Sequence, residues 1–397
     1  MVLVCLAVIG LLTLWPVPAQ APLSAATPFF CLPCGDSGLS DLLLNVVLFL
    51  PLGVGLRRSG MMVGKVTLVA AGISLLIELL QLTVIPGRDA SASDIVTNAA
   101  GAALGSWIAG AGPRALYPGG RWAAYLAGGW ALAGGMTAAF TAWSLEASFR
   151  ASTWYGQWAP FGGEPGWFDG AILAVELGSR PLPHWRLSDS KARRAELKRD
   201  TVRLTATVVS ITPPEERLRI VAVADSAGRM VTLSQRERDL SFGVRTRAAD
   251  VYLHSPVYLV PDVMPETAGD TIGLEGRYWK GVGQVQGQRG ELSPLDGWSL
   301  LIGAPVGGRL AIVASLVWLV GWFAPIGFYG GQLRRSAWAV APAWLLLAFP
   351  VLIAVVSGTP LPAPWEVAVG ATAALSGRVF CAALEPQSPD PEGRSGA

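Results

Sequence analysis

Two carboxylates and an arginine in a mostly apolar stretch form the set of residues best suited to chemistry. Glu78 and Asp94 could act as general base and general acid, and Arg88 between them could stabilise developing negative charge. The sequence contains no nucleophile motif, zinc-binding HExxH motif or phosphate-binding loop. An enzyme would therefore depend on these three residues, and a purely structural role for them stays open.

Other polar side chains share helical spacing with this set. Ser74, Glu78 and Gln81 fall at i, i+4 and i+7, so they lie on one face of a helix. The i, i+4 spacing recurs in the two neighbouring apolar runs, at Asp41 and Asn45 and at Asp94 and Asn98. A carboxylate within a membrane span costs about 3 kcal/mol, so it usually faces a bundle interior and a partner. We expect Arg88 to be that partner for Glu78 or Asp94.

The elements that must position these side chains are apolar helices. The chain has 397 residues, of which 52% are hydrophobic and 15% charged, whereas about 25% of residues are charged in a typical soluble domain. We predict a polytopic α-helical membrane protein with eight spans, at 1–19, 39–56, 62–85, 94–112, 122–144, 308–330, 336–357 and 364–384. An alternative for 1–19 is a signal peptide, because Ala19-Gln20-Ala21 suits signal peptidase. Gly101 and Gly105 favour close packing of the fourth span on a neighbour.

One segment of ordinary soluble composition interrupts the apolar chain. Between residues 146 and 296 lie 19 of the 30 basic residues and 19 of the 28 acidic residues, so the segment is nearly neutral and gives no electrostatic reason to expect nucleic acid. Short β-rich runs occur at 201–209, 218–224, 230–234, 241–246 and 251–253, with a hairpin-type turn at 225–228. This spacing predicts a β-sandwich inserted at 146–300.

Basic residues in short loops set the predicted orientation. Seven of them occupy alternate loops, which we place in the cytoplasm: Arg57, Arg58, Lys65, Arg114, Arg121, Arg334 and Arg335. The chain then divides into five spans in 1–145, an extracytoplasmic sandwich in 146–300, three spans in 308–384 and a disordered tail in 385–397. In this topology the polar side chains of spans two to four lie at one depth, near the outer surface.

Three smaller features allow more than one interpretation. Cys31 and Cys34 could form a local disulfide or remain two free thiols, and with His184 and His254 as the only histidines we expect no metal site and no cofactor. The aromatic residues at the start of the insert could stack on sugars or fill a core: Trp154, Tyr155, Trp158, Phe161, Trp167, Phe168 and Trp185. The charged run at 190–200 is expected to be a solvated surface turn.

Motifs in the first third of the chain occur in the order of a known family. They are Asn45 with LeuPheLeuProLeuGly (48–53), Glu78-x-x-Gln81, ProGlyArgAsp (86–89) and Asp94-x-x-x-Asn98-x-x-Gly101. With these motifs the segment resembles the VanZ-like membrane family. The resemblance implies a bacterial envelope protein with a link to glycopeptide-antibiotic tolerance, and it specifies no reaction.

The insert resembles a second kind of protein. AlaAspSerAlaGlyArg (224–229) and LeuGluGlyArgTyrTrpLysGlyValGlyGlnValGlnGly (274–287) are similar in order to laminin-G or concanavalin-like jelly rolls. This resemblance implies that the last strand pair closes the sandwich.

These observations lead to one functional prediction and two alternatives. We expect a multi-pass protein of the bacterial cytoplasmic membrane that contacts the lipid bilayer and recognises an envelope lipid headgroup, glycan or glycopeptide. Its predicted binding residues are Asp41, Asn45, Glu78, Gln81, Arg88, Asp94 and Asn98. The alternatives are an enzyme acting on a lipid-linked substrate, and a scaffold that presents the sandwich.

Overall fold

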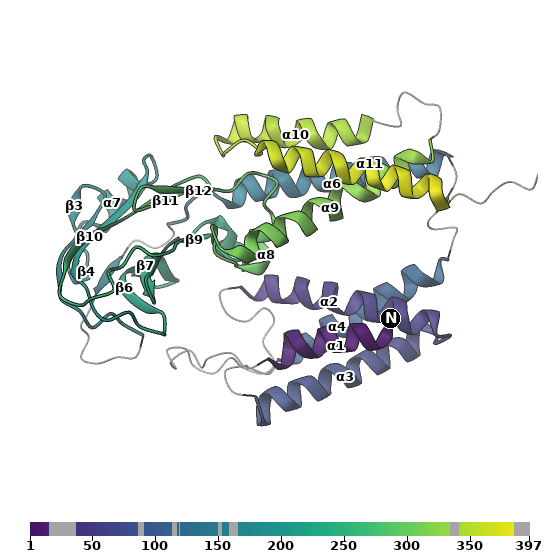
Figure 1. Cartoon of the computed structure of the whole chain (residues 1–397), viewed down its shortest axis with the longest axis horizontal. Coiled ribbons are helices and arrows are strands. Elements are labelled where there is room, and N and C mark those ends of the chain that lie inside the picture. Colours follow the sequence, from purple (N-terminus) through teal and green to yellow (C-terminus); the bar gives the residue numbers. More distant parts are fainter. Residues whose placement is uncertain are drawn as a thin grey trace, which may run out of the picture.

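Two groups of long helices extend away from a β-sandwich that lies at one end of the molecule (Figure 1). The computed structural model describes residues 1–15, 37–85, 91–112, 117–118, 120–149, 153–158, 166–333 and 341–384. We call helices α1–α4 the N-terminal unit, and helices α6 and α9–α11 the C-terminal unit.

The N-terminal unit contains α1 (Val2–Leu14), α2 (Gly38–Arg58), α3 (Val63–Thr83) and α4 (Ala92–Gly110). Glycines allow α2 and α4 to cross with their backbones in contact. A Cβ atom on Gly105 would overlap the carbonyl oxygen of Leu50, and one on Gly53 would overlap that of Ala102. A Cβ on Gly101 would likewise overlap the carbonyl oxygen of Val46. The close approach predicted from Gly101 and Gly105 is confirmed.

The C-terminal unit contains α6 (Gly120–Ser144), α9 (Arg309–Gly331), α10 (Ala341–Ser357) and α11 (Pro364–Leu384). Its central pair, α9 and α11, also crosses through glycines. A Cβ on Gly327 would overlap the carbonyl oxygen of Ala374, and one on Gly377 would overlap that of Ala324. Gly327 follows Pro325 by two residues, as Gly53 follows Pro51 in α2. The two units therefore share one type of helix crossing.

A helix overlaps each of the eight ranges predicted to span a membrane. In the described part of the chain, four helices are long and apolar enough to do so: α2, α3, α9 and the Pro364–Ala383 portion of α11. Helix α1 has only 13 residues and α10 only 17. The membrane character is thus supported, whereas the total of eight spans stays a prediction.

The β-sandwich consists of two antiparallel sheets of six strands each. One sheet has the order β4-β1-β6-β7-β8-β9 and the other β12-β11-β10-β5-β2-β3. The first contains β4 (Trp185–Arg186), β1 (Tyr155–Trp158), β6 (Leu218–Asp225), β7 (Gly228–Arg236), β8 (Asp239–Val244) and β9 (Val257–Val260). The second contains β12 (Gln288–Glu291), β11 (Val282–Val285), β10 (Thr271–Trp279), β5 (Val202–Val209), β2 (Ile172–Leu177) and β3 (Arg180–Pro181).

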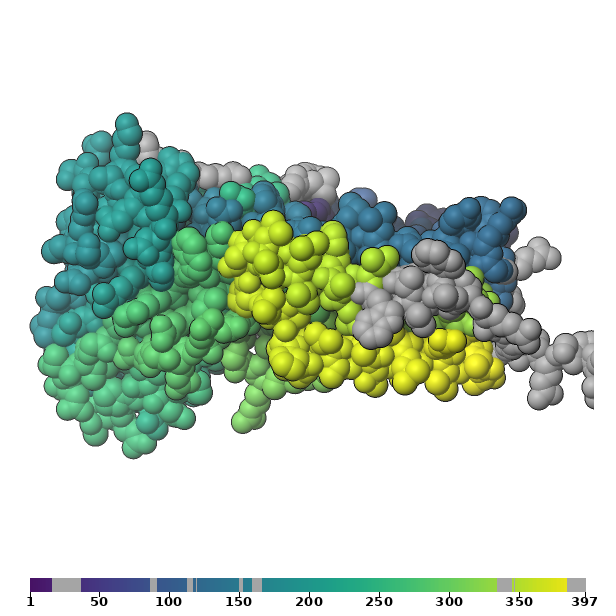
Figure 2. Space-filling model, turned by 90° about the horizontal axis from the view of Figure 1, so that it is seen from above, coloured from purple at the N-terminus to yellow at the C-terminus, as the bar shows by residue number. Residues whose placement is uncertain are grey.

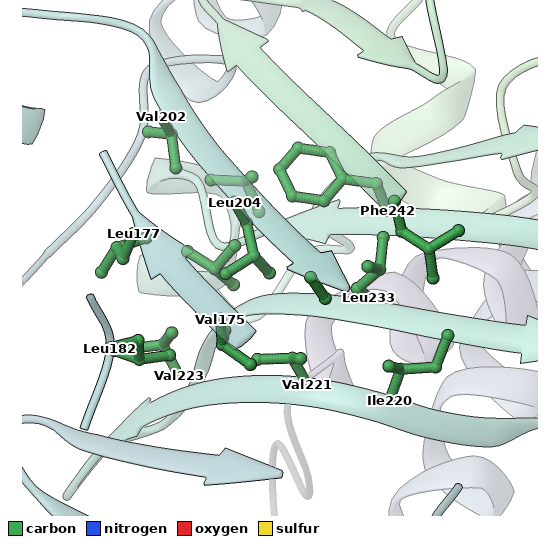
Figure 3. Close-up of a cluster of buried hydrophobic side chains, with 14 of the residues drawn as sticks. Val175, Leu177, Leu182, Val202, Leu204, Ile220, Val221, Val223, Leu233 and Phe242 are labelled. Atoms are coloured by element: carbon green, nitrogen blue, oxygen red, sulfur yellow. The ribbon is translucent and has the colours of Figure 1, made fainter. Parts of the chain in front are cut away.

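Alternating apolar residues of both sheets form the sandwich core. Val175, Leu204 and Ile220 are buried between the sheets with Leu233 and Phe242 (Figure 3). This alternation places one face of each strand inside, which is what two packed antiparallel sheets require. The two-sheet architecture is confirmed, and the closer likeness to a jelly roll stays a prediction.

The predicted turn at 225–228 is present in the structure, whereas the strand predicted at 251–253 is not. Asp225 and Gly228 pair at the end of the β6–β7 hairpin, where the Ala227 N–H donates to the Asp225 carboxylate at 2.7 Å. The strand predicted at 251–253 is absent, because Arg247–Val251 forms a short 3-10 helix. Tyr252 then ends that helix in the left-handed conformation, with φ of 58°.

The charged run at 190–200 was predicted to be a surface turn, and this prediction is wrong. Most of the run forms the helix α7 (Ser190–Leu197). Its Arg193 is only 5% exposed. The Arg193 guanidinium donates to the Asp189 carboxylate and to the carbonyl oxygens of Leu177 and Pro181. The sequence pattern missed this buried role, since all three partners lie outside α7.

The sandwich is bonded to both helical units. In the N-terminal unit, the Leu39 N–H donates to the Tyr252 carbonyl at 3.0 Å, and the Ser40 hydroxyl donates to the Leu300 carbonyl at 2.8 Å. Leu300 belongs to the short helix α8 (Trp298–Ile302). On the C-terminal side, the Lys280 ammonium donates to the Ser357 carbonyl at 2.7 Å. Figure 2 shows the sandwich at one end, with α10 and α11 extending from it.

Candidate functional site: a polar cluster between three helices

The polar side chains of α2 and α4 meet near the sandwich-facing ends of these helices. The Asn45 amide hydrogen-bonds the Asp94 carboxylate, and Asp41, one turn earlier in α2, interacts electrostatically with the same carboxylate. Asp94 is in the first turn of α4, and Asp41 is in the first turn of α2. Two helices that are 34 residues or more apart in the chain therefore place their polar groups at one level.

Helix α3 joins this cluster through two further contacts. The Asn98 amide donates to the Ser74 hydroxyl at 2.9 Å, and the Glu78 carboxylate accepts the Ser91 N–H at 2.7 Å. Glu78 also interacts electrostatically with Asp94. We define the polar cluster as Asp41, Asn45, Ser74, Glu78, Asp94 and Asn98.

Burial increases from the rim of the polar cluster to its floor. Asp41 is exposed, Asn45 and Asp94 are half-buried, and Glu78 and Asn98 are each 3% exposed. Gln81 points to another neighbour, since its amide donates to the Thr13 carbonyl in α1 at 2.9 Å. Gln81 was predicted to bind ligand, and in the structure its amide fixes α1 to α3.

The helices that form the polar cluster match a known family of membrane proteins. Residues 3–111 match the VanZ/LLP1 family model. The resemblance predicted for the N-terminal third is confirmed, and the rest of the chain lies outside the match. No curated protein and no solved structure matches the chain.

Some predicted site residues of the VanZ-like segment lie outside the described residues. These are Arg88, the proposed ion-pair partner, and Cys31 and Cys34, the disulfide candidates. Within the described ranges, no three His, Cys, Asp or Glu side chains converge as metal ligands. The polar cluster itself offers hydrogen bonding, ion pairing and proton transfer.

A second buried carboxyl pair lies where the sandwich meets α11. The Glu366 carboxylate accepts the Ala363 N–H at 2.6 Å and the Ser293 hydroxyl at 3.3 Å. Asp296 hydrogen-bonds Glu366 and accepts the Trp298 indole N–H at 2.9 Å. Burial raises the pKa of Asp296 above its ordinary value of 3.8. Sequence reasoning missed this pair because its two members are 70 residues apart.

The aromatic residues of the insert divide between the two interpretations given to them. Trp154 and Phe168 are fully buried in the sandwich core. Trp185 is 58% exposed, and the exposed His184 ring contacts it and Trp158 edge-on, with ring centroids 4.9 and 5.1 Å away. The core interpretation holds for the first two residues, and a sugar-stacking role for the exposed aromatic residues stays a hypothesis.

A pocket of about 190 Å³ lies on the sandwich, lined by Arg217, Arg236, Glu237, Asp239, Ser241, Leu259 and Pro305. Burial and the neighbouring Arg236 charge lower the pKa of Arg217. Because basic and acidic side chains both line this pocket, its charge selects no single class of ligand. No residue of the VanZ-like segment lines it.

Proposed function

We propose that the chain is a VanZ-like protein of the bacterial cytoplasmic membrane that recognises an envelope lipid headgroup, glycan or glycopeptide through its polar cluster. The observation that carries this proposal is the meeting of α2, α3 and α4 through Asn45–Asp94 and Asn98–Ser74. Polar side chains are costly in a membrane helix, and their convergence at one level favours a binding site over scattered packing contacts.

The proposed orientation places the sandwich outside the cytoplasm. Two observations support it. Leu39 and Ser40, at the start of α2, are hydrogen-bonded to the sandwich segment. Arg57 and Arg58 lie at the opposite end of the same helix. Basic residues favour the cytoplasmic side. In this orientation the polar cluster lies at the outer ends of α2, α3 and α4, beside the sandwich.

Replacement of Glu78 by glutamine tests the proposal. Glutamine keeps the size of the side chain and removes its charge, so we expect normal expression and loss of resistance in an envelope-antibiotic challenge. Glu366→Gln is the matched control, because it removes a buried carboxylate at the other end of the chain. If Glu78→Gln cells behave like wild type, the polar cluster has no role beyond packing.

Glu78 and Asp94 interact electrostatically, and this observation supports an alternative function as an enzyme. In that alternative the two residues act as base and acid on a lipid-linked substrate. Purified protein would be incubated with extracted envelope lipids and the products examined for a change in mass. Turnover that is lost in Glu78→Gln would establish the enzyme, whereas lipid binding without turnover would favour recognition.

A further inference from the structure

The polar cluster uses its hydrogen-bond donors internally and leaves an acceptor free. The Asn45 amide is bonded to Asp94, and the Asn98 amide nitrogen is bonded to Ser74. The Asn98 carbonyl oxygen is buried and has no partner among the described residues. A buried polar atom without a hydrogen bond costs roughly 1–3 kcal/mol, so a ligand that donates to this oxygen would recover that energy.

The carboxylates of the polar cluster also lack a described cation. Glu78 is 3% exposed and Asp94 half-buried, and each is within electrostatic range of a second carboxylate. Within the described ranges, no lysine or arginine forms an ion pair with Glu78 or Asp94. Like charges in a partly buried site repel, and a bound cation would relieve the repulsion.

The C-terminal unit provides an internal comparison. Ala102 and Gly105 are crossing residues of α4, and Ala374 and Gly377 are crossing residues of α11. Asp94 lies as many residues before the first pair as Glu366 lies before the second. At that equivalent position the protein supplies its own donors, because Glu366 accepts the Ser293 hydroxyl and the Ala363 N–H. In the α2–α4 crossing Asp94 likewise accepts from Asn45 and from the Ser93 hydroxyl at 3.3 Å, and the atom left without a donor among the described residues is the Asn98 carbonyl oxygen.

The polar cluster lies close to one end of α3. Glu78 lies five residues before the end of α3, which corresponds to about 7 Å along a helix. Leu75, Leu79 and Leu82 on the same helix are exposed, 46%, 49% and 67% respectively, and offer an apolar surface for an acyl chain.

We infer that the polar cluster binds the ammonium group of an amine-bearing membrane lipid. Glu78 and Asp94 pair with the charge, and the Asn98 carbonyl oxygen accepts a hydrogen bond from the same headgroup. This inference rests on the proposed function and specifies the chemistry of its ligand.

The test compares two lipids that differ at the amine. Full-length protein would be placed in phosphatidylglycerol nanodiscs containing either phosphatidylethanolamine or N-acetylated phosphatidylethanolamine with the same acyl chains, and retained lipid would be measured by native mass spectrometry. We expect at least tenfold preference for the free amine. Glu78→Gln should abolish that preference, while the matched control Glu366→Gln should keep it.

Two further variants secure the interpretation. Asn98→Asp retains the side-chain shape and adds a negative charge, so it should retain or increase the preference for the amine. Asp94→Asn should reduce the preference, and it replaces Glu78→Gln if that variant does not fold. If both lipids bind and Glu78→Gln weakens the binding of both equally, the ammonium assignment is wrong and the proposed function stands. Lipid retention unaffected by Glu78→Gln or Asp94→Asn would overturn both.

The source of the amine is tested by competition. Soluble glycerophosphoethanolamine should displace the retained lipid poorly, because it lacks the acyl chains that lie on α3. If the soluble compound binds as tightly as the lipid does, the assignment to a membrane lipid is wrong.

Discussion

Arg193 illustrates how a charged residue can be part of a protein core. Its guanidinium lies 2.8 Å from the Asp189 carboxylate and 2.8 Å from the Pro181 carbonyl, so one side chain links α7 to β3. Leu177 in β2 supplies a further carbonyl oxygen. The planar group has five N–H donors in fixed directions, which a lysine cannot reproduce.

We expect Arg193→Lys to destabilise the sandwich by about 2 kcal/mol, because carbonyl oxygens that the guanidinium satisfied become unpaired. Lys191→Ala, an exposed change in the same helix, should have little effect. Thermal unfolding of the detergent-solubilised chain measures both variants. Equal stability of the two would show that the buried guanidinium contributes no more than a surface charge.

Residue spacing indicated which polar side chains of the cluster share a helix face, because that property is local to one helix. The i, i+4 spacing of Asp94 and Asn98 placed them on one face of α4, and the structure has both in contact with neighbouring helices. The buried role of Arg193 and the Asp296–Glu366 pair were missed, because the carbonyl and hydroxyl partners lie in other elements. Periodicity specifies which residues share a face, but it contains no information on which distant segment covers that face.

At the scale of elements, two helix pairs depend on glycine for their contact. Gly105 in α4 faces the Leu50 backbone, and Gly377 in α11 faces the Ala324 backbone. At these two crossings the helices touch through backbone atoms instead of side chains, which is common where helices associate in membranes. The N-terminal pair also positions Asn45 against Asp94, so the crossing sets the geometry of the polar cluster.

Gly105→Ala should separate α2 from α4 and weaken ligand binding as well as stability, because the added Cβ overlaps a carbonyl oxygen. Gly72→Ala is the control, since a Cβ at Gly72 in α3 meets nothing within 4 Å. That change should be neutral or stabilise the helix by about 1 kcal/mol. Unfolding temperature and lipid retention would be measured for both variants.

The same comparison can be made in the C-terminal unit. Gly327→Ala should lower the unfolding temperature, while Gly321→Ala in the same helix has open space and should not. If Gly327→Ala is tolerated as well as Gly321→Ala, the two crossings are not equivalent in packing.

At the scale of the whole molecule, a buried carboxyl pair fixes the sandwich to α11. Asp296 and Glu366 share a hydrogen bond, which requires a proton on one of them. Both oxygens of Asp296 accept N–H groups, from Ser293 and Trp298, so the shared proton lies on Glu366. Burial also raises the pKa of the Asp296 carboxyl above its ordinary value. Its contribution to stability is therefore complete below the ordinary pKa of 3.8 and decreases as the pH rises above that value.

We expect the unfolding temperature of the full chain to fall between pH 5 and pH 9, and Glu366→Gln to reduce this dependence. Glutamine provides a permanent N–H donor to Asp296 at every pH. Tryptophan fluorescence is a suitable signal because Trp298 donates to Asp296. Equal pH dependence in the variant and the wild type would contradict a shared proton.

The orientation of the molecule can be tested with single cysteines. Ser226 is exposed at the β6–β7 hairpin, and Ser59 is exposed beside Arg57 and Arg58. In a chain whose native cysteines are replaced by serine, Ser226→Cys should react with an impermeant thiol reagent in intact cells. Ser59→Cys should react only after permeabilisation, and the opposite pattern would reverse the topology.

The attachment of α2 has a mechanical consequence. This helix is bonded to the sandwich at Leu39 and Ser40, and it carries Asn45 one to two turns further on. A force that displaces the sandwich would therefore act first on α2, and α4 would move with it, because the two backbones are in contact at Gly101 and Gly105. Such a displacement would move Asn45 and Asp94 together relative to Glu78 on α3.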